Sequence, residues 1–456
     1  MSIPSTEHHI PAPVHSAAYE RRRLFNWFPL GLTYALLYMG RYNLTVSKTA
    51  LGDLMSKAEF GTIFGVGAWV YALAFLVNGP ITDKIGGKRA MLIGSLGAAF
   101  ANLAMGLYLS YILTLPDPKV AHLTFVFSVL YGVNMYFQSY GAVAIVKVNA
   151  HWFHVRERGT FSGIFGIMIS TGLWLAFDVC DRILKFVAGG GPVLPEHTRW
   201  AFFAPAALLG AFFLIELVLL KDRPSEAGFE DFDTGDASSG DVTHEVPPVS
   251  RIIKQMLTHP VIMTIALTEF CTGIIRNGVM HWYRILAKEK MAAGFSGGWK
   301  YTSDNWGLML MVAGIIGGVF AGTVSDKLFQ SRRAPAAGFL YGVATIATLC
   351  MIPALNGDGW ALGFLVFLMS ICVIGTHGLL SGTATMDFGG RKSAATAVGI
   401  IDGFVYLGTG VQSLALGWIT TRNWTFWPVF MAPFALMGFL LLRRIWNATP
   451  QNTRRA

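Results

Sequence analysis

Long apolar runs recur along the whole chain and limit what it can fold into. Of its 456 residues, 53% are hydrophobic and only 13% are charged, which is too apolar for an ordinary soluble domain. The runs cover approximately residues 25–45, 60–82, 90–113, 123–147, 160–187, 200–220, 260–286, 305–325, 336–355, 360–384, 394–420 and 425–446. Each is long enough to cross a bilayer as a helix. The sequence therefore predicts an all-α membrane protein with twelve transmembrane helices.

One long polar stretch divides these runs into two groups of six. Residues 221–259 are rich in Asp, Glu, Ser, Gly and Pro, a composition that favours a flexible linker. We therefore expect a tail over residues 1–24, a first six-helix half over 25–220, the linker, a second half over 260–446 and a tail over 447–456.

The net charge of +9 could indicate a nucleic-acid partner, but the basic residues gather in short loops between apolar runs. These loops are those that follow every second run, and they carry Lys84, Lys88, Arg89, Arg156, Arg158, Lys327, Arg332, Arg333, Arg391, Lys392, Arg443 and Arg444. Cytoplasmic loops of membrane proteins show this bias. We expect both termini and the linker on the cytoplasmic side. The first run is long and has no small-residue cleavage site after it, so it is expected to be retained as a helix.

A loop motif is repeated in the two groups of runs. The segment from Gly79 to Arg89 reads Gly-Pro-Ile-Thr-Asp-Lys-Ile-Gly-Gly-Lys-Arg, and the segment from Gly322 to Arg333 again contains Ser-Asp-Lys before a basic cluster. The two copies lie about 240 residues apart, as expected for two parallel halves with a site between them. An acidic side chain at a helix end can pair with a base of a neighbouring helix. The predicted gating residues are Asp83, Lys84, Arg89, Arg158, Asp326 and Lys327.

Two arginines interrupt apolar runs, and their spacing along the chain is nearly that of the two loop copies. Arg41 lies in the first run and Arg276 in the seventh. A guanidinium stays protonated in a protein, and placing it near the bilayer centre costs at least about 2.5 kcal/mol. A water-filled cavity or an anion would offset that cost. The alternative for each arginine alone is a position near a helix end, from which the side chain reaches the interface.

Four stretches resemble a known family. The repeated loop resembles the signature of the major facilitator superfamily. Tyr38-Met-Gly-Arg-Tyr-Asn43, Phe137-Gln138, Ile275-Arg276-Asn277-Gly278 and Tyr406-Leu407-Gly408 resemble the organophosphate:phosphate antiporters, the group of the glycerol-3-phosphate and hexose-6-phosphate transporters. The resemblance implies two six-helix halves and a phosphate group bound by the two arginines. The residues expected at the substrate site are Arg41, Arg276, Tyr38, Asn43, Gln138, Tyr406 and Glu269.

Two acidic residues lie inside apolar runs. Glu269 is two turns from Arg276 along the same helix face, and Asp402 lies in the eleventh run. Intramembrane carboxylates are candidates for function. Glu269 could pair with Arg276 or take up a proton, and it could equally be the partner of another basic group in the bundle. Glu269 and Asp402 are therefore candidate coupling groups.

The predicted function is exchange of a phosphorylated small metabolite for inorganic phosphate by rocking of the two halves. Two alternatives remain: a proton- or sodium-coupled symporter of another organic anion such as a carboxylate or phosphonate, and a non-transporting sugar-phosphate sensor of the same fold. The sequence lacks a phosphate-binding Gly-Lys-Ser loop, paired Cys/His metal spacing and a Gly-x-Ser-x-Gly turn, so we expect neither an enzyme nor a cofactor. The expected partners are a small anion and lipid, with no nucleic acid. The expected protein is a monomer in a bacterial inner membrane.

Overall fold

The computed structural model describes residues 15–154, 157–232, 254, 257–329, 332–384 and 394–448. Of residues 119–120, 158–165, 326, 382–384 and 394–398 it describes the backbone alone. The α-helices are α1 (Ala17–Leu51), α2 (Lys57–Ile85), α3 (Gly87–Ile112), α4 (Leu123–Trp152), α5 (Arg158–Trp174), α6 (Cys180–Val187), α7 (Trp200–Leu219), α9 (Pro260–Ala292), α10 (Gly298–Asp304), α11 (Trp306–Lys327), α12 (Arg333–Ala354), α13 (Trp360–His377), α15 (Ala394–Arg422) and α16 (Phe426–Arg444). The π-helical segments are η3 (Leu175–Val179) and η6 (Gly378–Ala384), and short 3-10 turns are η1 (Gly52–Leu54), η2 (Pro118–Ala121), η4 (Pro195–Arg199) and η5 (Pro224–Ala227).

The predicted all-α bundle is confirmed. Twelve long helical segments cross it within the described chain, when α5–η3–α6 and α13–η6 each count as one. Eight of them are long and apolar enough to span a membrane by length and composition alone. The other four are α1, α4, the interrupted α5–α6 and α9. All four carry buried polar side chains, and three of them hold Arg41, Gln138 and Arg276.

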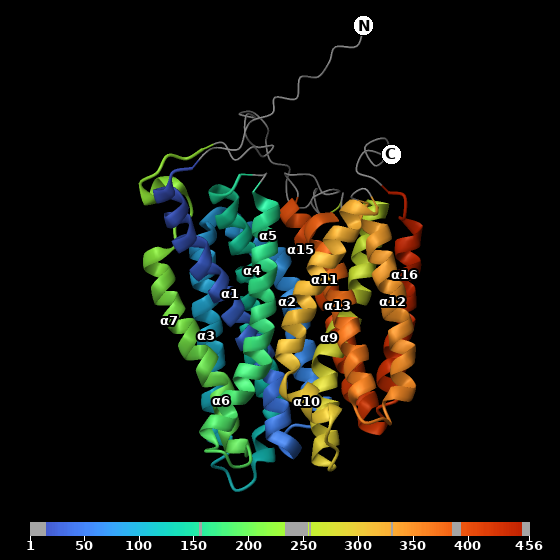
Figure 1. The fold of residues 1–456 in the computed structure, drawn as a ribbon. Coiled ribbons are helices and arrows are strands. Elements are labelled where there is room, and N and C mark those ends of the chain that lie inside the picture. The colour runs from blue at the N-terminus through green and yellow to red at the C-terminus, as the bar shows by residue number, and fades with distance from the viewer. Residues whose placement is uncertain are drawn as a thin grey trace.

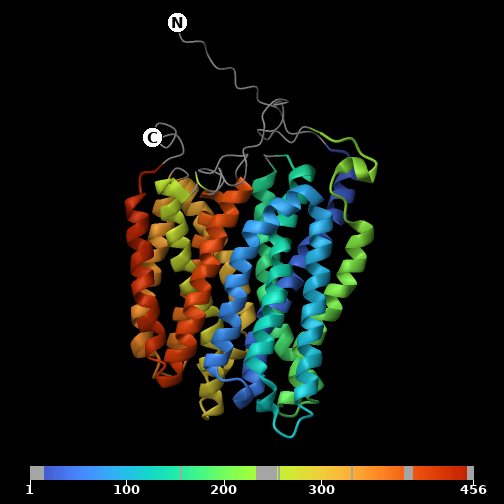
Figure 2. The ribbon, with the colours of Figure 1, turned by 180° about the vertical axis from the view of Figure 1, so that it is seen from behind.

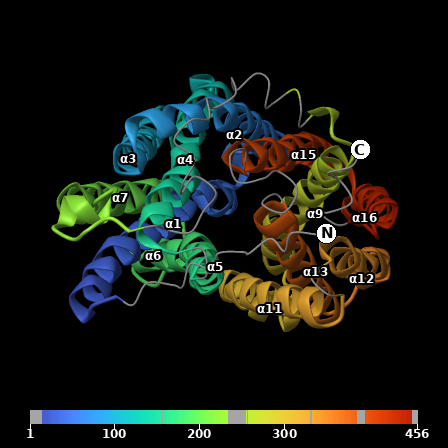
Figure 3. The same cartoon turned by 90° about the horizontal axis from the view of Figure 1, so that it is seen from above.

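The helices form two groups that stand side by side. The helices α1–α7 make one half and α9–α16 the other, as the view along the bundle shows (Figure 3). Two seams join them: α2 packs along α15, and α5 packs against α11. The seam of α2 and α15 is seen best from behind (Figure 2). The start of α1 and the end of α16 lie at the same end of the bundle, which we call the terminal end, and α6 and α10 lie at the opposite, far end (Figure 1).

Local sequence signals fix the ends of the first helices. Ser16 caps α1 by accepting a hydrogen bond from the Tyr19 amide at 3.2 Å. Ser56 and Glu59 form a capping box at the start of α2, in which each side chain bonds to the other residue's amide. Gly86 ends α2 with a φ of +88°, a backbone conformation that strongly favours glycine. The positive φ at the end of α2 therefore explains why glycine occupies position 86 of the first loop motif.

Candidate functional site

Arg41 lies at the centre of the bundle with no exposed surface. Its Nε donates to Gln138 Oε1 at 3.0 Å, Nη1 donates to the Tyr406 hydroxyl at 2.8 Å and Nη2 donates to the Tyr71 hydroxyl at 3.0 Å. Its guanidinium also lies over the rings of Tyr38 and Tyr71, at 4.7 and 4.5 Å from their centroids. Cation–π contacts of this kind are favourable when desolvated. Among the described residues, the side chains that contact this guanidinium are neutral, and one of them, Tyr406, belongs to the other half.

Arg276 comes from α9 in the second half and is 6% exposed. Its Nε has no hydrogen-bond partner, and no carboxylate of the described residues lies within ion-pair distance of it. Tyr42, Tyr406 and Tyr38 are its electrostatic neighbours. Two of these tyrosines, Tyr38 and Tyr406, also contact Arg41. The two cations predicted from the sequence therefore meet at one group of tyrosines, and we call Arg41, Arg276, Tyr38, Tyr42, Tyr71 and Tyr406 the arginine cluster.

Further buried polar atoms beside Arg276 lack partners among the described residues. His281 Nε2 is buried without a hydrogen-bond partner among the described residues, and the Tyr42 hydroxyl interacts with Arg276 but makes no hydrogen bond of regular geometry. The two rings lie 4.9 Å apart, and Phe64 and Phe177 pack against the same imidazole. His281 Nδ1 is 2.7 Å from the Thr45 hydroxyl of α1. An unsatisfied buried polar group costs about 1–3 kcal/mol, and several together at one place indicate a site that a ligand completes.

The electrostatics of the arginine cluster favour an anion. Two guanidiniums carry two positive charges into a region from which water is largely excluded, and hydroxyl and amide oxygens offset this only in part. Removing a charge from water costs several kcal/mol unless a counter-charge is present. Each guanidinium offers planar pairs of N–H donors, which match the oxygen geometry of phosphate or carboxylate. The arrangement can therefore bind an anion with several acceptor oxygens.

The structure brings most of the predicted site residues together. Tyr38, Gln138 and Tyr406 contact Arg41 directly. Asn43 does not: its amide nitrogen donates to Asn102 Oδ1 at 2.8 Å and to the Ala201 carbonyl at 2.9 Å. It joins α1 to α3 and α7 within the first half, as polar side chains often do between membrane helices.

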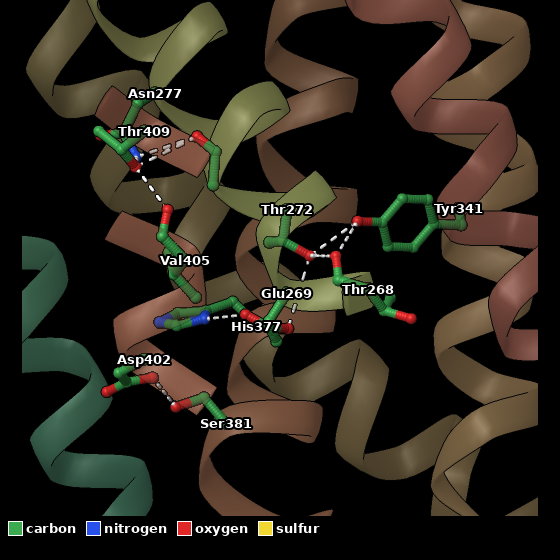
Figure 4. Close-up of polar contacts among 11 residues, drawn as sticks. Thr268, Glu269, Thr272, Asn277, Tyr341, His377, Ser381, Asp402, Val405 and Thr409 are labelled. Atoms are coloured by element: carbon green, nitrogen blue, oxygen red, sulfur yellow. Dashed lines mark hydrogen bonds and ion pairs between the residues drawn. The ribbon is translucent and has the colours of Figure 1, made fainter. Parts of the chain in front are cut away.

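Glu269 pairs with a base of another helix. Its Oε2 lies 2.7 Å from Nδ1 of His377, the last residue of α13 (Figure 4). Of the pairings considered from the sequence, the structure has the one with another basic group and not the one with Arg276. Asp402 accepts a hydrogen bond from Ser381 of η6. The sequence did not predict Tyr71 or the Glu269–His377 pair.

The predicted gating residues are only partly described. Asp83 Oδ1 lies 2.8 Å from Lys147 Nζ, and both side chains are substantially exposed. This pair joins α2 to α4 inside the first half, so it does not bridge the two halves. Lys84, Arg89 and Lys327 form no ion pair with another residue for which the structure gives a side chain. The side chains of Arg158 and Asp326 lie outside the described part.

Ion pairs that bridge the halves lie at the far end. Asp181 of α6 accepts from Arg284 Nη2 of α9 at 2.6 Å, and Lys185 of α6 lies 3.2 Å from Asp304 at the end of α10. Asp178 of η3 accepts from the backbone amides of Gly307 and Leu308 at 2.7 and 2.9 Å. A carboxylate at a helix N-terminus is stabilised by the unpaired N–H groups of its first turn. We call these contacts the far-end latch.

Removing the carboxylate of Asp181 from the far-end latch should open this end of the bundle. Arg284 has no exposed side-chain surface, while Asp181 is its ion-pair partner. Breaking a buried pair from one side costs about 3–5 kcal/mol because the remaining charge is left unpaired. In Asp181→Asn, separation of the halves lets water reach Arg284, so we expect a longer distance between spin labels on Phe186→Cys of α6 and Tyr301→Cys of α10. Both positions are exposed.

The control variant is Asp304→Asn, which removes one of the two acidic partners of the 49% exposed Lys185 and leaves the other, Asp181. An exposed pair contributes about 1 kcal/mol at most, so the label distance should stay as in the parent protein. Of the four cysteines only Cys350 is exposed, and Cys350→Ala provides the labelling background. An unchanged distance in Asp181→Asn would show that the latch does not hold the halves together.

Comparison with known proteins agrees with this architecture. The family model described as Major Facilitator Superfamily matches residues 30–413. The chain belongs to the major facilitator superfamily. A solved major facilitator structure supports the fold: a bacterial homologue of the human lysosomal transporter Spinster, in an inward-facing and unoccupied conformation, aligns with a TM-score of 0.69 and 15% identity over 94% of this chain and 98% of that one.

Curated relatives agree with the resemblance to organophosphate:phosphate antiporters. The chain is 25% identical over 442 residues to the glycerol-3-phosphate transporter of Bacillus subtilis (strain 168), covering 94% of each chain. It is 23% identical to a probable hexose phosphate transport protein of Chlamydia pneumoniae, covering 96% of this chain and 93% of that one. It is 23% identical to the membrane sensor protein UhpC of Escherichia coli (strain K12), covering 95% and 94%. This superfamily consists of membrane transporters and not enzymes.

Proposed function

We propose that this major facilitator protein exchanges a phosphorylated small metabolite for inorganic phosphate. The observation that carries the proposal is the state of Arg276: a buried guanidinium from one half, without an anionic partner among the described residues, that shares its tyrosines with Arg41 of the other half. A phosphate group carries one to two negative charges near neutral pH and has several acceptor oxygens. It matches both the charge and the donor geometry of the arginine cluster.

The two-half origin of the arginines supports alternating access. An anion bound by Arg41 and Arg276 draws the halves together, and it lowers the free energy of the states in which they close on it. Without the anion, the closed states hold two uncompensated cations. Reorientation of the empty protein is then disfavoured, which is the physical basis for obligatory exchange.

The proposed setting is a bacterial inner membrane. The basic loops favour both termini and the linker on the cytoplasmic side, which makes the terminal end cytoplasmic and the far end external. In this arrangement the halves over residues 25–220 and 260–446 rock about the arginine cluster, and the far-end latch holds the external side shut. The protein works as a monomer surrounded by lipid.

The names of the relatives support the substrate class. Glycerol phosphate and hexose phosphates both present a terminal phosphate on a small polyhydroxylated group, so a shared phosphate site suits either. The second candidate function, a sugar-phosphate sensor, is favoured by the similarity to UhpC. A sensor uses the same arginine cluster but binds its anion without exchanging it.

The test is counterflow in proteoliposomes loaded with inorganic phosphate. We expect external labelled phosphate to enter rapidly, and a competition panel of glycerol phosphate, hexose phosphates, phosphonates and carboxylates to identify the preferred anion. Empty liposomes and liposomes loaded with sulfate serve as controls. Binding of a sugar phosphate without counterflow would support the sensor, and uptake that needs no internal anion would favour a symporter.

A further inference from the structure

A buried acid in the second half has an imidazole as its close partner. Glu269 of α9 is fully buried, and its Oε2 lies 2.7 Å from Nδ1 of His377 at the end of α13 (Figure 4). At this distance one of the two groups donates a hydrogen bond to the other, so at least one proton lies between them. The His377 side chain is 24% exposed while Glu269 is not exposed at all, so the imidazole is the accessible member of the pair.

Among the other described neighbours of Glu269, Arg276 alone carries a fixed positive charge, and it lies two turns away on the same helix. Thr272 lies 3.5 Å from Oε1, and its hydroxyl is 2.7 Å from that of Tyr341 on α12, which donates in turn to the Thr268 carbonyl. The titratable groups that face Glu269 are His377 from α13, Asp402 from α15, Tyr341 from α12, and Cys271 and Arg276 from α9 itself. The ion-pair partner of this carboxyl is thus a group that itself gains and loses a proton.

A second carboxyl lies beside this pair. Ser381 of the π-helical segment η6 donates to Asp402 of α15, and η6 begins directly after His377. The continuous segment α13–η6 therefore contacts Glu269 through His377 and Asp402 through Ser381. Isolated π-helical turns are frequent at functional sites. We call Glu269, His377, Ser381 and Asp402 the acid–imidazole cluster.

The acid–imidazole cluster is connected to the arginine cluster through two helices. Glu269 is two turns before Arg276 on α9, which is about 10 Å along the axis. Asp402 is one turn before Tyr406 on α15, and Tyr406 accepts from Arg41. Ionised carboxylates here attract the guanidiniums and compete with an incoming anion. A proton bound to the cluster removes one negative charge and relieves that competition.

We propose that the Glu269–His377 pair binds a proton together with the transported anion. The inference rests on the proposed function, because it concerns the same anion site. The proton adds to the pair when the anion enters the arginine cluster and leaves when the anion leaves, so that one proton accompanies each anion. Linkage is reciprocal: acidification raises anion affinity by the same factor by which the anion raises proton affinity.

The first test measures protons taken up per anion bound. Inorganic phosphate is titrated into the purified protein by calorimetry at one pH in two buffers with different ionisation enthalpies. We expect wild type to take up about one proton more per phosphate than Glu269→Gln and His377→Gln, since ionisation of the phosphate itself is common to all. The matched control is Glu216→Gln, another fully buried carboxyl, on α7 in the first half, and it should behave as wild type.

The second test uses transport. Phosphate counterflow is measured over a series of pH values that are equal on both sides. Relative to Glu216→Gln, Glu269→Gln should lose the pH dependence that the pair contributes, so that the ratio of the two rates changes at least tenfold across the series. His377→Gln should do the same, so a folding failure of one variant does not decide the matter. Equal proton uptake and an equal pH dependence of counterflow in wild type and both variants would overturn the inference while leaving phosphate exchange intact. Absence of phosphate binding and counterflow in folded wild type would overturn the proposed function, and the inference with it.

Discussion

Arg276→Lys is expected to lose phosphate exchange while the protein remains folded. Lysine keeps the charge but replaces a planar set of donors by a single ammonium group on a flexible stem. A hydrogen bond to a charged group contributes about 1.5–3 kcal/mol, and each 1.4 kcal/mol corresponds to about tenfold. Loss of one or two such bonds should lower counterflow at subsaturating phosphate by about 10- to 10,000-fold.

The measurement is the initial rate of labelled phosphate entry into phosphate-loaded proteoliposomes. Arg422→Lys is the matched control, because Arg422 lies over the Trp418 ring at the far end of α15, away from the arginine cluster. It should exchange phosphate at the parent rate. Arg276→Ala should lose at least as much activity as Arg276→Lys. Full exchange in Arg276→Lys would exclude paired donation by the guanidinium, and full exchange in Arg276→Ala would remove Arg276 from the anion site.

Gly273→Ala is expected to destabilise the second half strongly. A Cβ at this position would lie 1.9 Å from the Val405 carbonyl oxygen and 2.8 Å from its carbonyl carbon. These are backbone atoms of α15, so no side chain can move aside and the two helices must separate. Small residues allow this kind of close approach between membrane helices. Overpacking usually costs about 1–3 kcal/mol, and a backbone collision should reach the upper part of that range.

Thermal unfolding of the detergent-solubilised protein measures the effect, with a clear fall in Tm expected for Gly273→Ala. Gly318→Ala is the control, since nothing lies within 4 Å of the added Cβ there. Alanine is also the better helix former by about 0.8–1 kcal/mol, so Gly318→Ala should unfold at the parent temperature or above it. An unchanged Tm in Gly273→Ala would mean that α9 and α15 lie further apart than the contact between Gly273 and the Val405 carbonyl indicates.

Separation of α9 from α15 in Gly273→Ala should also affect function. The α9 helix carries Arg276 and α15 carries Tyr406, which binds Arg41. Thr409 of α15 accepts from the Asn277 amide nitrogen at 2.8 Å and donates to the Gly273 carbonyl at 3.4 Å, and these contacts fix the register of the two helices. Widening their gap should therefore reduce phosphate exchange even where Gly273→Ala folds.

Hydropathy predicted the helical bundle well because a bilayer demands long apolar helices. It predicted helix ends less well. The first apolar run begins near residue 25, yet α1 begins at Ala17, since Ser16 caps it and a helix continues through polar turns outside the membrane. The run over 160–187 became α5, η3 and α6. A π-turn changes the backbone hydrogen bonds without changing composition, so hydropathy does not reveal it.

The candidate site was predictable in part, for reasons of distance in the chain. Buried charges are conspicuous in apolar runs, so Arg41, Arg276 and Glu269 were identified. Their partners are harder to identify. His377 is 108 residues from Glu269, whereas Arg276, one of the two kinds of partner considered from the sequence, is about 10 Å away along the helix. Tyr71 was missed because a tyrosine in an apolar run resembles any other packing aromatic. Asn43 was assigned to the site from a motif, although its amide joins helices of one half.

The unequal bonding of the two arginines has a consequence for which anions are refused. Arg41 already donates three hydrogen bonds, to Gln138, Tyr406 and Tyr71, whereas Arg276 is unsatisfied at Nε. An anion can bond directly to the unsatisfied Nε of Arg276, but full use of Arg41 requires it to replace the oxygen acceptors that already hold three of the five N–H donors. Chloride, a single sphere without directional lone-pair geometry, cannot replace several oriented bonds at once. Arg41, whose donors already have acceptors, would then discriminate against chloride, because only an anion with several oxygen atoms can replace those acceptors.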